Sequence, residues 1–279
     1  MKEIAEILFN VFMFAFVASS MISSGLGLTI SEIKEPLKNI KMVTLSLIAN
    51  FVLVPLFAFG IVWAIPVSEG LRIGIILLSI SGGAAFIPNI VKIAKGRMGG
   101  AVGLMLLLLI VTIFLMPIVV PLIFQEATVS SWEIAKSLIV SMFFPLLIAL
   151  FVKARFPDIA KRILPFFIKF TNFTVLVLII LVLYLYTKVI IVNASILPVI
   201  LLFFLGAMAI GYFTGGKNRN ARIILSVGTG LRNPPIAILV GSQYFVSEPI
   251  AAITPLLGMI IGLAILFPLA KIIGKNNNT

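Results

Sequence analysis

The sequence predicts an all-α polytopic membrane protein with about nine transmembrane helices. Hydrophobic residues make up 61% of the 279 positions, charged residues make up 11%, and the mean hydropathy is +1.25. Apolar segments of roughly 20 residues, the length that a helix needs to cross a bilayer, recur along the chain. Two of these segments are interrupted by glycine and proline, which is typical of the discontinuous helices of secondary transporters.

Each expected span follows from one apolar segment bounded by charged or turn-forming residues. The connections are short, so the sequence predicts a single transmembrane transporter domain over residues 1–279 with no soluble domain. In chain order the expected spans are residues 5–28, 42–65, 71–95 (broken), 98–124, 133–153, 163–187, 194–214, 221–245 (broken) and 250–272.

The composition excludes several classes of function. The chain contains neither cysteine nor histidine. Disulfides, thiolate metal sites and the usual proton shuttle are therefore impossible. With no acidic residue in the interior of an expected span, general acid–base and metal catalysis lack their usual side chains, so we expect no enzyme and no cofactor.

The net charge of +12 reflects membrane topology rather than nucleic-acid binding. With the N-terminus outside, fifteen of the 21 basic residues lie on the cytoplasmic side and four lie outside. The positive-inside rule therefore predicts a multi-pass protein of the plasma or inner membrane with its C-terminus in the cytoplasm. The expected partners are the lipid bilayer and a small molecule, with no nucleic acid, and the chain is expected to be a monomer or a homodimer.

The two broken spans are the third and the eighth, so they cross the membrane in opposite directions. This spacing predicts an inverted repeat, with a first repeat over about 5–124 and a second over about 133–272 that carries an extra leading helix. The first break contains Ser81-Gly82-Gly83 and Pro88-Asn89, and the second contains Asn233-Pro234-Pro235. Proline removes a helix donor and clashes with the preceding turn, so neither span can be a continuous helix.

Arg232 is the single charge in the segment from Ile223 to Phe245. It lies about 14 Å into a helix that rises ~1.5 Å per residue, close to the midplane of a ~30 Å hydrocarbon core. A buried arginine there costs at least ~2.5–3.5 kcal/mol and must face protein or water. This position marks the second break as a candidate binding site.

Three stretches resemble the bile acid:sodium symporter family, within the wider group of arsenite and auxin carriers. They are Gly25-Leu26-Gly27-Leu28-Thr29, the run from Gly82 to Asn89 closing on Ala94-Lys95-Gly96, and the run from Gly228 to Asn233. The resemblance covers nearly the whole chain. It implies two crossed discontinuous helices, alternating access and sodium sites at the crossover.

The chain departs from the family pattern at the first sodium site that the resemblance implies. Gly228 stands where the family has glutamate, and Pro88 stands near the family's serine. The hydroxyl positions on the next span fall around Ala101 and Met105. A hard cation needs several oxygen ligands, so this site is expected to be lost.

At the second sodium site, Arg232 replaces the glutamine that the resemblance implies. A sodium ion that binds without it would use oxygens at Asn50, Asn89, Thr229 and Leu231, and we expect no firm metal site. The candidate substrate-binding or crossover residues are Arg232, Asn233, Asn89, Pro88, Thr229, Gly228, Pro234 and Asn50.

Three roles are open for Arg232. It could bind the carboxylate of a substrate, because its planar fork of donors matches that group. It could act as a built-in cation in place of sodium, or it could only brace the carbonyl groups that the broken helices free. Unpaired N–H groups at the start of the half-helices would favour an anion in all three cases.

The sequence thus predicts a secondary transporter for a small organic anion, sodium-independent or weakly sodium-dependent. The alternative is a sodium-coupled organic anion symporter. A channel would need rings of equivalent ligands, which the chain lacks.

Overall fold

The computed structural model describes residues 2–27, 39–124, 130–192 and 196–275, and throughout these ranges the regular elements are helices. The all-α prediction is therefore confirmed. Leu28 and Thr29 of the first family-like stretch, and two of the expected cytoplasmic lysines, Lys34 and Lys38, lie outside the described residues.

The helices follow the expected order of spans. Several spans consist of two α-helices, joined either by a π-helical turn or by a break. The elements are α1 (Lys2–Gly27), α3 (Ile40–Ile48), a π-helical segment (Ala49–Leu53), α4 (Val54–Ala64), α5 (Glu69–Ile80), α6 (Ile87–Ile93), α7 (Met98–Ile123), α8 (Ser131–Leu138), a second π-helical segment (Ile139–Phe143), α9 (Phe144–Arg155), α10 (Pro157–Val192), α11 (Ile196–Thr214), α12 (Arg219–Gly230), α13 (Pro234–Tyr244) and α14 (Ile250–Lys275).

Eight helices of the described chain are long and apolar enough to cross a membrane. The pair α5 and α6, interrupted between Ile80 and Ile87, supplies one further passage, which agrees with the expected count of about nine. The clearest boundary difference is α10, which begins at Pro157 rather than at 163. Proline suits the first helical turn, and Asp158 favours the positive end of the helix.

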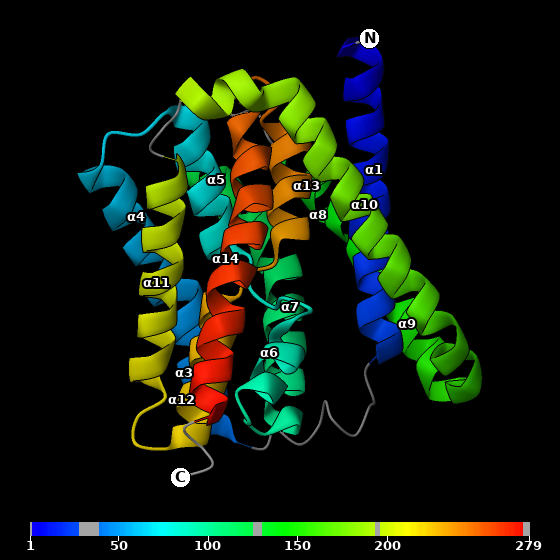
Figure 1. Ribbon diagram of the computed structural model, residues 1–279, viewed down its shortest axis with the longest axis vertical. Coiled ribbons are helices and arrows are strands. Elements are labelled where there is room, and N and C mark those ends of the chain that lie inside the picture. The colour runs from blue at the N-terminus through cyan, green and yellow to red at the C-terminus, as the bar shows by residue number, and fades with distance from the viewer. Residues whose placement is uncertain (1, 28–38, 125–129, 193–195, 276–279) are drawn as a thin grey trace.

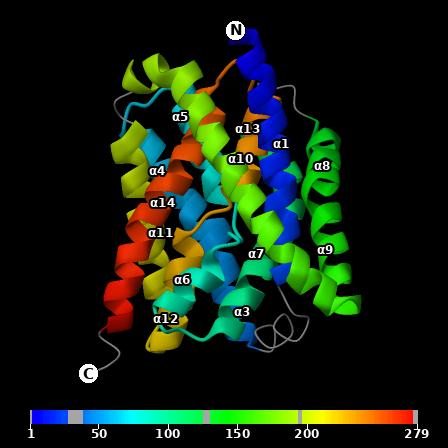
Figure 2. The same ribbon diagram turned by 45° about the vertical axis from the view of Figure 1, so that its right-hand side comes forward.

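The helices form two bodies, visible in Figures 1 and 2. The first, here called the scaffold body, consists of α1, α8, α9 and α10. Its helices α1 and α9 pack closely at Gly25, where an added Cβ would lie 2.6 Å from Ala149 Cβ. In the same body the rings of Phe12 (α1) and Phe173 (α10) meet edge to face at 6.1 Å. The second, the crossover body, contains the remaining helices and the two broken spans.

The two broken spans run in opposite directions through the crossover body. Figure 1 shows α5 and α13 near the N-terminal end of the bundle, and α6 and α12 near the other end. Opposite directions are what an inverted repeat requires, whereas the repeat itself and its boundaries stay predictions. The last turns of α9 and α14 and the first turn of α12 lie at the end opposite the N-terminus, and the orientation of the chain in the membrane also stays a prediction.

Candidate functional site

The two breaks meet in the middle of the crossover body and are hydrogen-bonded to each other. The main-chain N–H of Asn233 donates to the carbonyl of Ser81 at 2.8 Å. Its side-chain Nδ2 donates to the carbonyl of Gly83 at 3.0 Å. Asn233 is 1% exposed. It therefore joins the two discontinuous helices through both its backbone and its amide.

Local sequence explains why the first break forms where it does. The hydroxyl of Ser81 donates to the carbonyl of Leu77 at 2.5 Å, which competes with a further turn of α5. Thr112 of α7 bonds the next peptide, because its hydroxyl accepts from Gly82 N at 2.9 Å and donates to Gly82 O at 3.3 Å. Gly83 then turns with φ +83°, a conformation that residues with a Cβ rarely adopt.

Arg232 lies beside this junction and uses all five of its donors on protein oxygens. Its Nε donates to the carbonyl of Leu78 at 2.9 Å. Nη1 donates to Asn50 Oδ1 at 2.6 Å and to the carbonyl of Thr229 at 3.3 Å. Nη2 donates to the carbonyls of Asn50, at 3.4 Å, and Ser79. We call these five acceptors the crossover oxygens.

Three of the crossover oxygens are main-chain carbonyls that the surrounding helices leave unpaired. A fourth, the carbonyl of Leu78, also accepts from the N–H and the hydroxyl of Ser81, at 3.1 and 3.2 Å. Ser79 and Thr229 stand in the last turns of α5 and α12, where carbonyls lack helical partners. At Asn50 the cause is the π-helical segment. There the N–H of Val54 bonds the carbonyl of Ala49, and the next residue, Pro55, has no N–H to offer to Asn50.

Asn50 is fixed from both ends of its amide. Its Nδ2 donates to the carbonyl of Ser46 at 3.0 Å and to the hydroxyl of Thr229 at 3.3 Å. Its Oδ1 is thereby directed at the guanidinium. Asn50 and Thr229 are both fully buried, and the structure brings them together with Arg232 as the sequence suggested.

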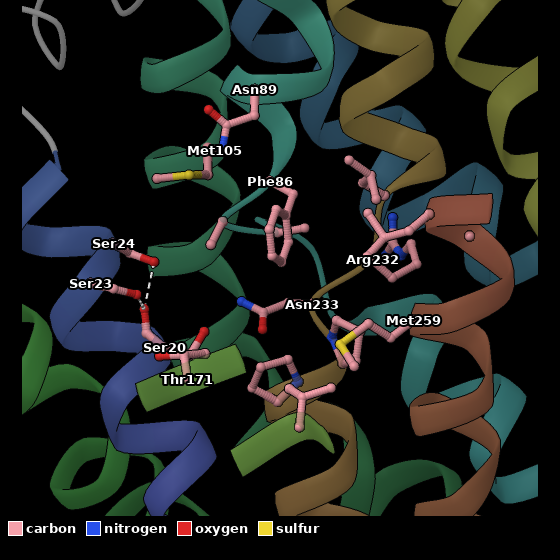
Figure 3. A pocket seen from close by; sticks show the side chains of 18 of the residues that line it. Ser20, Ser23, Ser24, Phe86, Asn89, Met105, Thr171, Arg232, Asn233 and Met259 are labelled. Carbon is pink, nitrogen blue, oxygen red and sulfur yellow. Dashed lines mark hydrogen bonds between the residues drawn. The ribbon is translucent and has the colours of Figure 1, made fainter. Parts of the chain in front are cut away.

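Burial limits what Arg232 can do in this conformation. The residue is 1% exposed, and Figure 3 shows it directed away from the serines of α1, which are Ser20, Ser23 and Ser24. With every donor occupied, the guanidinium has none left for a substrate carboxylate. The geometry therefore favours the roles of brace and built-in cation over direct substrate contact.

The half-helices offer fewer free N–H groups than the sequence suggested. Pro88 occupies the first turn of α6, and Pro234 and Pro235 begin α13. These three prolines have no N–H, so the expected anion site at the helix starts is weaker than predicted. The N–H of Ile87 is also used, because it donates to the carbonyl of Ala84 at 3.1 Å.

A cavity of about 480 Å³ lies between the scaffold body and the two breaks (Figure 3). On the crossover side it is lined by Asn233, Pro88, Pro234 and the exposed Asn89, whose amide hydrogen-bonds to no described residue. Apolar side chains complete much of the wall, and they include Phe16, Phe86, Met105, Phe204 and Met259.

The scaffold wall of the cavity carries hydroxyls and an amide. The Ser23 and Ser24 hydroxyls donate to the carbonyl of Ser20 at 3.0 and 2.7 Å, which leaves their oxygens free to accept. Thr171 of α10 bonds Ser19 of α1 at 3.0 Å. Asn172 also lines the cavity. The cavity thus has a polar wall on the scaffold side, supplied by α1 and α10.

The positions that the resemblance assigns to the first sodium site are packed among apolar side chains. A Cβ at Gly228 would lie 2.6 Å from Leu104 Cδ2, so a longer side chain does not fit there without displacing Leu104. Ala101 and Met105 are buried in α7. Within the described residues no cluster of acidic side chains could hold a metal ion.

Several contributors could not be found from the sequence. Ser79 and Leu78 act through carbonyl groups, which no side-chain pattern reveals. Phe204 and Met259 reach the cavity from apolar spans in which they resemble any lipid-facing residue. Ser81 and Thr112 carried a usable signal, since polar residues in apolar spans are uncommon.

The comparisons with known proteins agree with this geometry. One relative is described as "Uncharacterized sodium-dependent transporter YocS" from Bacillus subtilis (strain 168), and it is 25% identical over 150 residues. The match covers 53% of this chain and spans about half, 47%, of that relative. The chain also matches, over residues 14–193, the family described as the Sodium Bile acid symporter family. This family consists of transporters rather than enzymes, as expected, and the chain belongs to the Sodium Bile acid symporter family.

Proposed function

We propose that this protein is a secondary transporter that moves a small organic anion, most simply a carboxylate, without requiring sodium. The observation that carries the proposal is the guanidinium of Arg232 seated among the crossover oxygens. Five oxygens around one cation resemble an alkali-ion site, and the side chain fills that site permanently. The positive charge that a bound ion would supply is therefore always present.

The cavity supports an anionic, partly apolar substrate. Among the described residues no acidic side chain lines it, and Arg232, which forms part of its wall, has no acidic partner there. In a low-dielectric interior such a charge favours an anion at short range. The amides of Asn89 and Asn172 can donate to a carboxylate, while Phe86 and Met259 contact its apolar part.

Alternating access follows from the two bodies. The cavity lies at their interface, so relative movement of the scaffold body against the crossover body would expose it to either side of the membrane. Hydrogen bonds between the breaks hold the crossover body together as one unit.

The test is the thermal stability of the purified protein with a panel of small carboxylates, each in sodium and in potassium. A ligand that binds the folded state raises the melting temperature by mass action. Stabilisation that is equal in the two salts is expected. Stabilisation by no carboxylate in either salt would contradict the proposal.

A sodium-coupled symporter is the second candidate, favoured by the description of the Bacillus subtilis relative as a sodium-dependent transporter. It predicts stabilisation by a carboxylate in sodium alone. In that case an ion site exists elsewhere in the crossover body, and sodium independence is wrong.

Replacing Asn89 with leucine is expected to weaken carboxylate binding roughly tenfold to a hundredfold, because a hydrogen bond to a charged group contributes about 1.5–3 kcal/mol. Asn89 is exposed to the cavity and bonds no described residue, so the melting temperature without ligand should not change. The matched control is Asn10→Leu, an exposed position of α1 away from the cavity. Equal affinities in the two variants would remove Asn89 from the site.

A further inference from the structure

A second cavity, of about 320 Å³, lies at the far end of the crossover body. It is enclosed by α11, α12 and α14, which pack together at the end opposite the N-terminus (Figure 1). It shares no lining residue with the first cavity, which lies between the scaffold body and the two breaks. The scaffold body contributes none of the walls of the second cavity. The transport cycle proposed above therefore makes no use of it.

The chemistry of this cavity changes from one end to the other. Its outer end carries Arg219 and Arg222, at the first turns of α12, together with Tyr212 of α11. The N-terminus of α12 adds partial positive charge at the same place. The lining residues further from that end are mostly apolar and include Met208, Val227 and Leu266.

Arg222 is held in position, whereas Arg219 is free to move. The Nε of Arg222 donates to the carbonyl of Gly216, and Nη1 donates to the hydroxyl of Tyr212 at 3.2 Å. Its guanidinium also lies 4.9 Å from the centre of the Tyr212 ring. Arg219 is exposed and forms no hydrogen bond with a described residue. The one ion pair among the described residues joins Arg72 and Glu69, so no acidic side chain there neutralises either arginine.

We propose that this cavity binds an anionic phospholipid of the surrounding bilayer. The phosphate of the headgroup would lie between Arg219 and Arg222, which offer the planar donor forks that suit phosphate oxygens. An acyl chain would lie along the apolar wall toward the bilayer core. Basic cavities between transmembrane helices at the cytoplasmic surface have the charge and depth that such headgroups require. The proposal does not depend on the transported substrate.

The experiment measures binding to the full chain purified in a neutral detergent. Three probes are compared by native mass spectrometry and by melting temperature: dioleoyl phosphatidylglycerol, dioleoyl phosphatidylcholine and glycerol 3-phosphate. Phosphatidylglycerol is expected to remain bound and to raise the melting temperature. The other two are expected to do neither, because one lacks net charge and the other lacks acyl chains.

Variants locate the site. Arg219→Glu is expected to weaken phosphatidylglycerol binding at least about fivefold, because each basic residue near an anionic headgroup contributes about 1 kcal/mol and the new carboxylate repels the phosphate. The matched control is Arg155→Glu, an exposed arginine at the same end of the scaffold body, which should leave binding unchanged. Arg222→Gln is the second variant and should also weaken binding.

Four outcomes would overturn the proposal. Equal retention of the two phospholipids would show that charge is not recognised. Binding of glycerol 3-phosphate as strong as that of the lipid would make the site one for a free phosphate. Equal losses in Arg219→Glu and Arg155→Glu would indicate diffuse attraction to a basic surface, and absence of bound phosphatidylglycerol from the unaltered protein would exclude the site outright.

Discussion

Replacing Arg232 with alanine is expected to lower the melting temperature of the purified protein by about 10 °C. The substitution leaves four of the five crossover oxygens without a donor in a buried place, because only the carbonyl of Leu78 has a second partner, Ser81. Loss of one partner from a buried charged network costs about 3–5 kcal/mol. In a chain of this size, each kcal/mol corresponds to roughly 2–4 °C. Arg155→Ala, which removes an exposed arginine, is the control and should shift the melting temperature little.

The same variant separates a built-in cation from a simple brace. With the guanidinium gone, the crossover oxygens are expected to accept a small cation, so sodium or methylguanidinium should recover part of the lost stability of Arg232→Ala. The unaltered protein should melt at the same temperature in sodium and in potassium. A sodium-specific rise in the unaltered protein would show that a sodium site persists beside the arginine.

Replacing Gly83 with alanine is expected to prevent folding or to destabilise the protein by more than about 4 kcal/mol. An added Cβ would lie 2.3 Å from the backbone nitrogen of Leu109, where no rotation of a side chain relieves the overlap. The φ of +83° adds strain for any residue with a Cβ. The first break and α7 would have to separate, which would displace Gly82 from Thr112.

The control for this prediction is Gly60→Ala in α4. An added Cβ there meets no atom within 4 Å, and alanine is favoured over glycine in a helix by about 1 kcal/mol. Gly60→Ala should therefore melt at the same or a higher temperature, measured by thermal unfolding in detergent. A Gly83→Ala variant that melts at the same temperature as the unaltered protein would show that α7 can move aside.

The sequence was sufficient for the spans because hydropathy and proline positions act locally. The break at Asn233-Pro234-Pro235 appears where two missing donors require it, and Arg232 stood out as a charge at the midplane. The association of Asn50 with Arg232 was suggested by the family resemblance, and the structure places them 2.6 Å apart.

What the sequence could not predict depends on backbone geometry or on distant contacts. The role of Pro55 emerges only with the π-helical segment, because a proline in an apolar span ordinarily signals no more than a kink. The sequence also could not show that every donor of Arg232 is occupied. Four of its five acceptors come from α5 and from the π-helical segment, more than 150 positions away in the chain. If those acceptors are not known, the guanidinium of Arg232 is equally suited to a substrate carboxylate. The sequence therefore could not exclude direct contact with the substrate.

The tethered guanidinium has an electrical consequence. A co-transported sodium ion carries its charge across the membrane and offsets that of an anionic substrate, whereas the charge of Arg232 never leaves the protein. Each cycle of the proposed carrier then moves the net charge of its cargo. One elementary charge across 100 mV corresponds to about 2.3 kcal/mol, or roughly a fiftyfold concentration ratio. An interior-negative membrane would therefore drive a monovalent anion outward, so this carrier is suited to export, or to import that is sustained by rapid consumption inside the cell.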